Sequence, residues 1–358
     1  MLNKIKAVVV DDSAFMRKSL SIMLESDSEI EVVGTARDGL DGFNLIKSVK
    51  PDIVTLDVEM PRMDGLTALK KIMAECPTSV IMVSSITTEG AEATLKALEL
   101  GAVDFIPKEL SYVSVNIVKI KEDLIRKVKE IVRQRAVQMR LRRIQGFSTG
   151  EPNKQSAPAM PSRSLPRIGY RAIALGVSTG GPMSLQKVVP VISKNINCPM
   201  FIVQHMPPKF TKSLADRLNG ISQLEVKEAE HNETVRNGVV YLAPGGFHMT
   251  LRKTLSGSVI IDISETPAET LHRPSVDVMI NSVLKVYGKN TLGVIMTGMG
   301  KDGYEAIREL KSLGGYTIAQ DEQSCIVYGM PKAIVDAGLA DVVAPLERIP
   351  EVINKAIV

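Results

Sequence analysis

One serine in the second half of the chain lies between glycines at an expected strand-to-helix turn. Ser178 belongs to the stretch Gly176-Val177-Ser178-Thr179-Gly180-Gly181, which follows an apolar run over residues 172–175 and precedes a helical pattern from about Pro182. This arrangement is typical of a nucleophile elbow, because the glycines allow a tight turn and the helix start supplies free N–H groups. Such groups can hold the oxyanion of a tetrahedral intermediate. The stretch therefore predicts a serine nucleophile for acyl transfer.

A histidine and an aspartate follow two other expected strands. His205 comes directly after the apolar run Phe201-Ile202-Val203-Gln204, and Asp302 lies in the glycine-rich turn after residues 292–296. The carboxyl ends of the strands in a parallel sheet share one edge, where active sites form. Ser178, His205 and Asp302 can therefore meet although they are distant in sequence. We interpret them as the nucleophile, the base and the acid of a serine hydrolase.

Two rival interpretations have weaker support. A dinucleotide-binding turn requires the spacing G-x-G-x-x-G and an acidic residue after the next strand, where this chain has Gln204-His205. An ordinary α/β-hydrolase places its acid before its histidine. Asp216 followed by His248 or His272 has that order. We prefer the first assignment, because Asp216 falls within an apparent amphipathic helix and neither of those histidines has the strand-then-loop setting of His205.

A second group of reactive side chains follows the expected strands of the first part of the chain. Asp11 and Asp12 follow the first strand, Asp57 follows the third, Ser84 ends the fourth, and Lys108 follows the fifth. Carboxylates clustered at one edge of a sheet repel one another and favour a hard divalent cation, and Mg²⁺ suits oxygen ligands and phosphate chemistry. A carboxylate nucleophile, a metal, a hydroxyl and an ammonium group are the parts needed to accept a phosphoryl group on Asp57.

Both halves of the chain alternate apolar runs with helical patterns. In the first half the strand-like runs end at Val10, Val33, Leu56, Val83 and Ile106. This alternation predicts an α/β fold, with two doubly wound parallel-sheet domains whose helices cover both faces of each sheet. In the second half we expect an antiparallel excursion formed by Val239–Leu242, residues 247–251 and residues 259–263.

A basic helix and a polar segment separate the two expected domains. Residues 113–143 form one helical pattern, and residues 146–167 are rich in Ser, Pro and Gly, as is typical of a flexible linker. We therefore expect a first domain over residues 1–127, a helix extension and linker over residues 128–167, and a second domain over residues 168–358.

The composition excludes several classes of protein. The net charge of +4 across 358 residues does not indicate a large basic surface for binding nucleic acids, and the absence of Trp argues against base-stacking platforms. The three widely spaced cysteines indicate neither a disulfide framework nor a zinc site, and free thiols suit a reducing cytosol. The short apolar run near the N-terminus ends in Asp11-Asp12, so we expect neither a signal peptide nor membrane insertion.

The first domain resembles the receiver domain of two-component response regulators. The matching stretches are Val9-Val10-Asp11-Asp12-Ser13, Leu56-Asp57-Val58-Glu59-Met60-Pro61-Arg62-Met63-Asp64-Gly65, Met82-Val83-Ser84-Ser85 and Asp104-Phe105-Ile106-Pro107-Lys108. The resemblance implies a flavodoxin-like fold with Asp57 as phosphoacceptor and a Mg²⁺ site for phosphorylation at Asp11, Asp12 and Asp57. It further implies a phosphate switch made of Ser84, Phe105 and Lys108.

The chain as a whole resembles the chemotaxis protein-glutamate methylesterases. A receiver is followed by the Ser178 stretch, Gln204-His205-Met206-Pro207, Ala243-Pro244-Gly245-Gly246-Phe247-His248 and Met296-Thr297-Gly298-Met299-Gly300-Lys301-Asp302-Gly303. The resemblance implies a Rossmann-like catalytic domain that hydrolyses glutamate methyl esters on chemoreceptors and deamidates receptor glutamines, without a cofactor for the hydrolysis. It implies the catalytic triad already inferred and an oxyanion hole at Thr179 and Met299.

The resemblance also implies the setting in which the protein works. The phosphodonor would be the chemotaxis histidine kinase, the substrates would be methyl-accepting chemoreceptors, and the place would be the cytoplasm, at receptor arrays. A regulatory binding module that has lost catalysis is a second hypothesis, which the intact serine, histidine and aspartate stretches disfavour. A DNA-binding output is a third, but the second half is too long and too α/β in pattern for a simple helix-turn-helix module.

Overall fold

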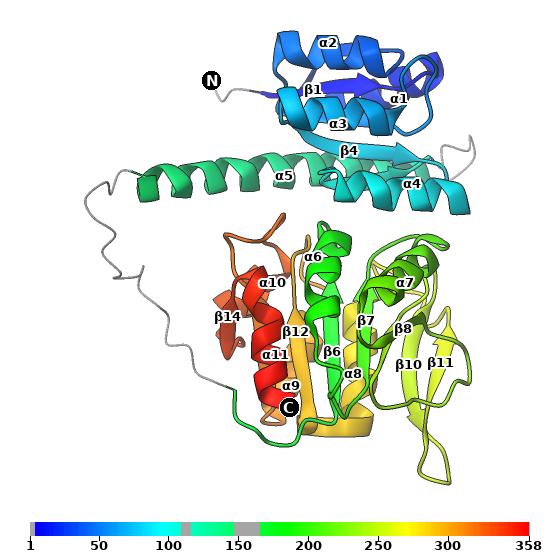
Figure 1. The fold of residues 1–358 in the computed structure, drawn as a ribbon, viewed down its shortest axis with the longest axis vertical. Helices are drawn as coiled ribbons and strands as arrows, with labels where there is room; N and C mark the ends of the chain where they lie inside the picture. The colour runs from blue at the N-terminus through cyan, green and yellow to red at the C-terminus, as the bar shows by residue number, and fades with distance from the viewer. Residues whose placement is uncertain (1–3, 109–115, 147–164, 358) are drawn as a thin grey trace. The chain divides into compact units, whose positions relative to one another are not determined.

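The computed structural model describes residues 4–108, 116–146 and 165–357, with the side chains of residues 116–119 and 142–146 left aside (Figure 1). Most of the expected linker therefore lies outside the described residues. The chain divides into two compact units, Met1–Val137 and Gln138–Val358, and each is described by itself. Both contain a parallel sheet flanked by helices, which confirms the predicted fold class.

The N-terminal unit is built on a five-stranded parallel sheet in the order β2-β1-β3-β4-β5. The strand order reverses between β1 and β3, so the loops after these two strands diverge and leave a crevice at the carboxyl edge. The strands are β1 (Ile5–Val10), β2 (Ile30–Ala36), β3 (Ile53–Asp57), β4 (Ser79–Ser84) and β5 (Asp104–Pro107). The helices are α1 (Ala14–Glu25), α2 (Gly39–Val49), α3 (Gly65–Glu75), α4 (Thr88–Glu99) and α5 (Asn116–Gly146).

Helix α5 packs through an apolar stripe and a partly buried lysine that reaches β5. Leu124, Val128 and Ile131 are buried. Lys127 lies among them, with its Nζ 2.9 Å from Asp104 Oδ2 and 3.0 Å from the Phe105 carbonyl oxygen, to which it donates. Burial alone would lower the pKa of Lys127, but its acidic neighbours raise it above its usual range. This ammonium group is therefore a charged link between β5 and α5.

We predict that Lys127→Ala destabilises the N-terminal unit by about 3 kcal/mol, because the mutation leaves the Asp104 carboxylate buried without its partner. Calorimetry of the full chain should show the transition of this unit at a lower temperature. The matched control is Lys96→Ala, which removes an exposed pair with Glu99 and should cost less than about 1 kcal/mol. Equal effects of the two mutations would contradict the assigned role of Lys127.

The C-terminal unit is built on a seven-stranded parallel sheet in the order β14-β13-β12-β6-β7-β9-β8. The order reverses between β6 and β12, which makes the carboxyl ends of these two strands the expected place for a site. The strands are β6 (Ala172–Val177), β7 (Met200–Gln204), β8 (Glu225–Glu228), β9 (Val239–Leu242), β12 (Thr291–Ile295), β13 (Tyr316–Gln320) and β14 (Val342–Ala344). The α-helices are α6 (Gly181–Val188), α7 (Phe210–Ile221), α8 (Val276–Tyr287), α9 (Tyr304–Ser312), α10 (Met330–Asp336) and α11 (Ile349–Ile357), and short 3₁₀ turns cover Val189–Val191, Gly288–Asn290 and Leu346–Arg348.

The predicted antiparallel excursion is wrong in its first strand. β9 (Val239–Leu242) pairs in parallel with β7 and β8 and belongs to the main sheet. All four of its residues are buried, as is usual for a parallel strand covered on both faces. The antiparallel pair is formed by β10 (His248–Lys253) and β11 (Val259–Ser264).

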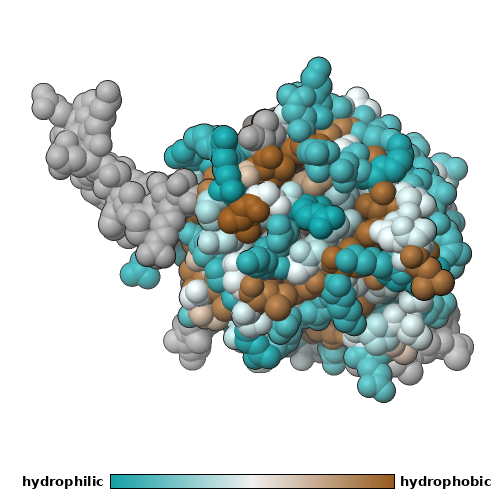
Figure 2. Space-filling view, turned by 90° about the horizontal axis from the view of Figure 1, so that it is seen from below, coloured by the Kyte–Doolittle hydropathy of each residue, from teal (hydrophilic) through white to brown (hydrophobic). Residues whose placement is uncertain are grey.

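Among the helices that the structure describes, none combines the length and apolar character that crossing a bilayer requires. On the face seen in Figure 2, hydrophobic side chains are interspersed with hydrophilic ones.

Candidate active site

The predicted nucleophile lies in a tight turn between β6 and α6. The Ser178 N–H donates to the Thr297 carbonyl oxygen at 2.9 Å, and the Gly181 N–H donates back to the Ser178 carbonyl oxygen at 2.8 Å. Gly180 precedes α6 with φ +75°, and a Cβ atom there would lie 2.5 Å from the Ile326 side chain. This turn therefore requires glycine for both its backbone conformation and its packing.

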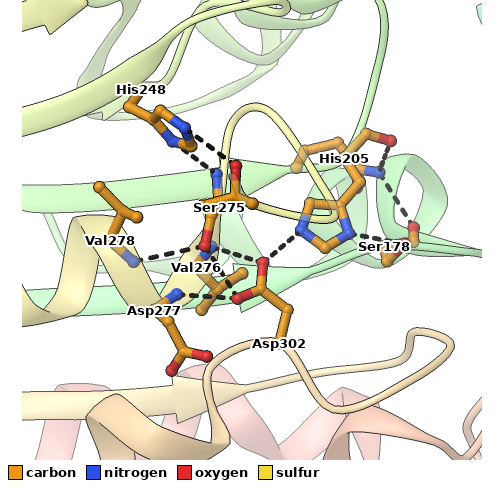
Figure 3. Close-up of polar contacts among 10 residues, drawn as sticks. Ser178, His205, His248, Ser275, Val276, Asp277, Val278 and Asp302 are labelled. Atoms are coloured by element: carbon orange, nitrogen blue, oxygen red, sulfur yellow. Dashed lines mark hydrogen bonds and ion pairs between the residues drawn. The ribbon is translucent and has the colours of Figure 1, made fainter. Parts of the chain in front are cut away.

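His205 follows the neighbouring strand β7 and reaches both of its predicted partners. Its Nδ1 lies 3.2 Å from Ser178 Oγ, and its Nε2 lies 2.8 Å from Asp302 Oδ2 (Figure 3). Buried Gln204 supports this arrangement, because its Nε2 donates to the carbonyl oxygens of Ser178 at 3.0 Å and of His205 at 3.2 Å. The structure thus brings together the three side chains that were predicted to form a triad.

The two hydrogen bonds assign the tautomer of His205. An ionised carboxylate only accepts hydrogen bonds, so Nε2 carries the proton and donates a hydrogen bond to Asp302. Nδ1 is then unprotonated and faces the hydroxyl of Ser178, from which it can take a proton. This assignment reverses the roles that the two ring nitrogens have in the chymotrypsin-type triad, although the chemistry is the same.

The Asp302 carboxylate is held at the start of α8. Oδ1 accepts from Ser275 Oγ and the Asp277 N–H, both at 3.0 Å, and Oδ2 accepts from the Val276 N–H at 2.7 Å as well as from His205 (Figure 3). Burial alone would raise the pKa of Asp302, but the His205 imidazole and the N–H groups hold it well below its usual range. The acid therefore stays ionised and fixed in orientation.

A second aspartate joins the start of α8 to the start of α9. Asp277 Oδ1 accepts from the Ala306 N–H at 2.8 Å, while its own N–H donates to Asp302. Burial and the neighbouring Asp302 charge raise the pKa of Asp277 to about 6. Sequence reasoning missed both Asp277 and Ser275. The one available signal was Ser275 before an apolar helical pattern, which is typical of an N-cap, and its Oγ indeed accepts from the Val278 N–H.

Of the two residues predicted to form the oxyanion hole, Thr179 adjoins the nucleophile and Met299 follows a glycine that packs on it. Thr179 follows Ser178 directly and is buried, and its carbonyl oxygen accepts from Thr297 Oγ1 at 2.9 Å. Gly298, in the loop after β12, packs so closely on Ser178 that a Cβ atom there would lie 2.8 Å from the Ser178 Cβ. Met299 is the next residue along the chain and is buried. The packing is compatible with the predicted pair of N–H donors, whose role stays a prediction.

The acid and the histidines of the alternative triad, in which Asp216 precedes the histidine, have other contacts in the structure. Asp216 forms an ion pair with Lys212 on α7, at 2.7 Å, and both side chains are more than half exposed. His248 is fully buried; its Nδ1 accepts from the Ser275 N–H at 3.3 Å, and its Nε2 lies 3.1 Å from the Pro267 carbonyl oxygen. His272 stacks on the ring of His205. The geometry therefore favours Asp302 over Asp216 as the acid.

We predict that Asp302→Asn lowers turnover by roughly 10⁴-fold while the domain stays folded, because a neutral side chain no longer fixes the Nε2–H tautomer. Asp216→Asn is the matched control and should leave turnover unchanged, since it removes only an exposed ion pair. Steady-state hydrolysis by the purified variants is the measurement. A fast Asp302→Asn variant together with an inactive Asp216→Asn variant would support the order found in α/β-hydrolases.

The N-terminal unit holds its predicted acidic cluster at the carboxyl edge of its sheet. Carboxylate oxygens of Asp11, Asp12 and Asp57 lie within 4.8 Å of one another; Asp11 and Asp57 are buried, whereas Asp12 is exposed. Lys108 Nζ lies 2.6 Å from Asp57 Oδ2 and 3.4 Å from Asp11 Oδ2.

Ser84 Oγ donates to the Gly90 carbonyl oxygen in α4 at 3.1 Å. The predicted phosphate-switch residue Phe105 is buried, with the ammonium group of Lys127 over its ring.

The electrostatics of this cluster suit a hard cation. Burial raises the pKa of Asp57 to about 6; hydrogen bonding to Lys108 opposes this shift, and the Asp11 charge adds to it. Burial also raises the pKa of Asp11, against the opposing effect of Lys108. Three converging carboxylate oxygens, two of them from buried side chains, are a donor set that Mg²⁺ prefers. The residues present therefore fit the predicted ion.

The fold and the two sites together define a class of protein. One unit is a receiver-type sheet with an acidic cluster at its switch point, and the other is a parallel α/β sheet with a serine, a histidine and an aspartate in contact at its own switch point. Such a chain joins a signal-input module to a serine-hydrolase module. Residues 173–353 match the family model described as CheB methylesterase. Residues 7–116 match the family model described as Response regulator receiver domain. The chain belongs to the CheB methylesterase family.

Similarity to known proteins extends over the full length. A protein-glutamate methylesterase/protein-glutamine glutaminase from Pyrococcus abyssi is 47% identical over 356 residues, with 99% of this chain and 94% of that protein covered. A protein of the same name, numbered 1, from Oleidesulfovibrio alaskensis is 49% identical over 367 residues, with 99% of each chain covered. The crystal structure of the Thermotoga maritima CheB methylesterase catalytic domain is 45% identical and covers 51% of this chain and 96% of that one, with a TM-score of 0.49.

Proposed function

We propose that this chain is a phosphorylation-regulated serine hydrolase that demethylates glutamate methyl esters on chemoreceptors and deamidates specific receptor glutamines, for chemotactic adaptation. The observation that carries the proposal is the line of contacts from Ser178 through His205 to Asp302. Relatives that match nearly the whole chain have both activities in their names. The chemistry uses side chains, backbone N–H groups and water.

The first half of the proposed reaction forms an acyl-enzyme. His205 Nδ1 accepts the Ser178 proton while Oγ attacks the carbonyl carbon of the substrate. The N–H groups of Thr179 and Met299 hold the oxyanion that develops. The imidazolium then donates its proton to the leaving group, so that an ester releases methanol and a glutamine side chain releases ammonia. Asp302 stabilises the imidazolium through the bond from Nε2.

The second half regenerates the enzyme. His205 takes a proton from water as the water oxygen attacks the acyl carbon, and the same proton returns to Ser178 Oγ as the acyl bond breaks. The product is a glutamate carboxylate, which adds a negative charge to the receptor where the ester had none. This change of charge is the output of the reaction.

Phosphorylation of Asp57 is the proposed input. Asp11, Asp12 and Asp57 would hold Mg²⁺, which neutralises charge on the transferring phosphoryl group when it is bound. Lys108 already contacts Asp57 and would pair with the phosphoryl group. Ser84 would have to release the Gly90 carbonyl oxygen to reach that group. This exchange of partners, together with movement of buried Phe105, is the proposed switch.

The proposed partners and cellular location follow from the same two activities. The chemotaxis histidine kinase would be the phosphodonor, methyl-accepting chemoreceptors would be the substrates, and the protein would act in the cytoplasm at receptor arrays. We assign signal input to residues 1–127, the helix extension and linker to residues 128–167, and catalysis to residues 168–358.

The test of this function is methanol release from membranes that contain chemoreceptors with isotopically labelled glutamate methyl esters. The full chain should release labelled methanol, and Ser178→Ala should lower the rate by about 10⁶-fold, because the other triad members depend on the nucleophile. Circular dichroism should show that the variant is folded. A folded Ser178→Ala variant with near-normal methanol release would contradict the assigned nucleophile.

We further predict that acetyl phosphate and Mg²⁺ label Asp57 and accelerate methanol release by roughly 5- to 150-fold, which is the range of a coupling of ~1–3 kcal/mol between two states. Chelation of Mg²⁺ should abolish labelling, because the acidic cluster then lacks its cation. Asp57→Asn should remain unlabelled and keep the resting rate. Labelling of Asp57→Asn on another residue, at the rate of the unmodified chain, would argue against the assigned phosphoacceptor.

A further inference from the structure

The ring of His272 lies flat against the proposed base. The centroids of the His205 and His272 rings are 4.1 Å apart, and the two planes differ by 20°. His272 comes from the segment between β11 and α8, which is remote in sequence from β7. Because His205 already bonds Ser178 and Asp302 along its edges, the stacked ring contacts a part of the imidazole that neither hydrogen bond uses.

The segment that carries His272 is fastened by the buried ring of His248. One nitrogen of His248 accepts from the Ser275 N–H, and the other lies 3.1 Å from the Pro267 carbonyl oxygen and 3.2 Å from Thr270 Oγ1. Burial lowers the pKa of His248, which favours the neutral ring that this pattern requires. The segment is therefore held on both sides of His272. Its last residue, Ser275, also donates to the triad acid.

The stacking constrains a motion that the hydrogen bonds leave open. Bonds from Nδ1 and Nε2 fix the two edges of the imidazole, but the ring can still tilt about the line that joins these bonds. Such a tilt turns the Nδ1 lone pair away from the Ser178 hydroxyl and weakens proton transfer, which depends steeply on alignment. A flat neighbour 4.1 Å away resists this tilt and shields one face of the ring from water.

We propose that His272 is a positioning residue for the hydrolase reaction, and that its ring surface, rather than its nitrogen atoms, keeps His205 aligned between Ser178 and Asp302. The proposal rests on the function proposed above. It assigns His272 neither a proton-transfer step nor a contact with the substrate. A substitution that keeps a flat ring should therefore preserve the rate, and one that removes the ring should lower it.

The experiment compares His272→Ala with His272→Phe in the full chain, with methanol release from methylated receptor membranes as the readout. His272→Ala should lower kcat by roughly 3- to 10-fold, the equivalent of one lost aromatic contact, and leave KM nearly unchanged. His272→Phe should restore most of kcat. The control is His231→Ala, which removes a half-exposed histidine whose Nδ1 accepts from the Ile263 N–H, and which should not change either constant.

The outcomes separate this proposal from the proposed function. If the unmodified chain releases no methanol, the proposed function fails. If the unmodified chain is active and His272→Ala has the same kcat, the positioning role is wrong. If His272→Phe is as slow as His272→Ala, the nitrogen atoms are needed, and the proposal is overturned. A change confined to KM would also overturn it, since the ring would then act on substrate binding.

Discussion

The catalytic unit depends on one interaction, the binding of the Asp302 carboxylate to the first residues of α8. Four donors converge on its two oxygens, and the positive end of the helix dipole favours an anion at this place. The same interaction fixes the loop after β12, the start of α8 and, through Asp277, the start of α9. His205 is aligned because its acid cannot move, so the triad is preorganised in the resting enzyme.

Each unit places a carboxylate at the carboxyl edge of its sheet, beside the point where the strand order reverses, but the charges of Asp302 and Asp57 are stabilised differently. Asp302 has a pKa well below its usual range, because its hydrogen-bond donors outweigh burial. Asp57 has a pKa raised to about 6, because burial and Asp11 outweigh the single ammonium group of Lys108. The first carboxylate is stabilised without a ligand and serves as a fixed orienting group. The negative charge of the second carboxylate is only partly balanced by Lys108, which suits a group that binds a metal ion and accepts a phosphoryl group.

The sequence was sufficient to predict the functional side chains that follow directly after a strand. Ser178, His205 and Asp302 could be predicted to meet, because apolar runs marked their strands and parallel strands share one carboxyl edge. Contacts made by the segment between β11 and α8 could not be predicted, since nothing in local spacing shows that His272 stacks on His205 or that Ser275 donates to Asp302. The direction of β9 was also misjudged, because an apolar run of four residues fits a parallel and an antiparallel strand equally well.

Catalysis requires that Asp302 hold the proton of His205 on Nε2 and leave Nδ1 free for Ser178. The most direct measurement is NMR of the chain labelled with ¹⁵N in its histidine rings, with the resonances assigned by comparison with His205→Gln. We expect a strongly deshielded proton coupled to Nε2 of His205, an unprotonated Nδ1, and loss of that proton signal in Asp302→Asn. A proton found on Nδ1 of His205 in the unmodified chain would overturn this tautomer and the role of Asp302 in fixing it.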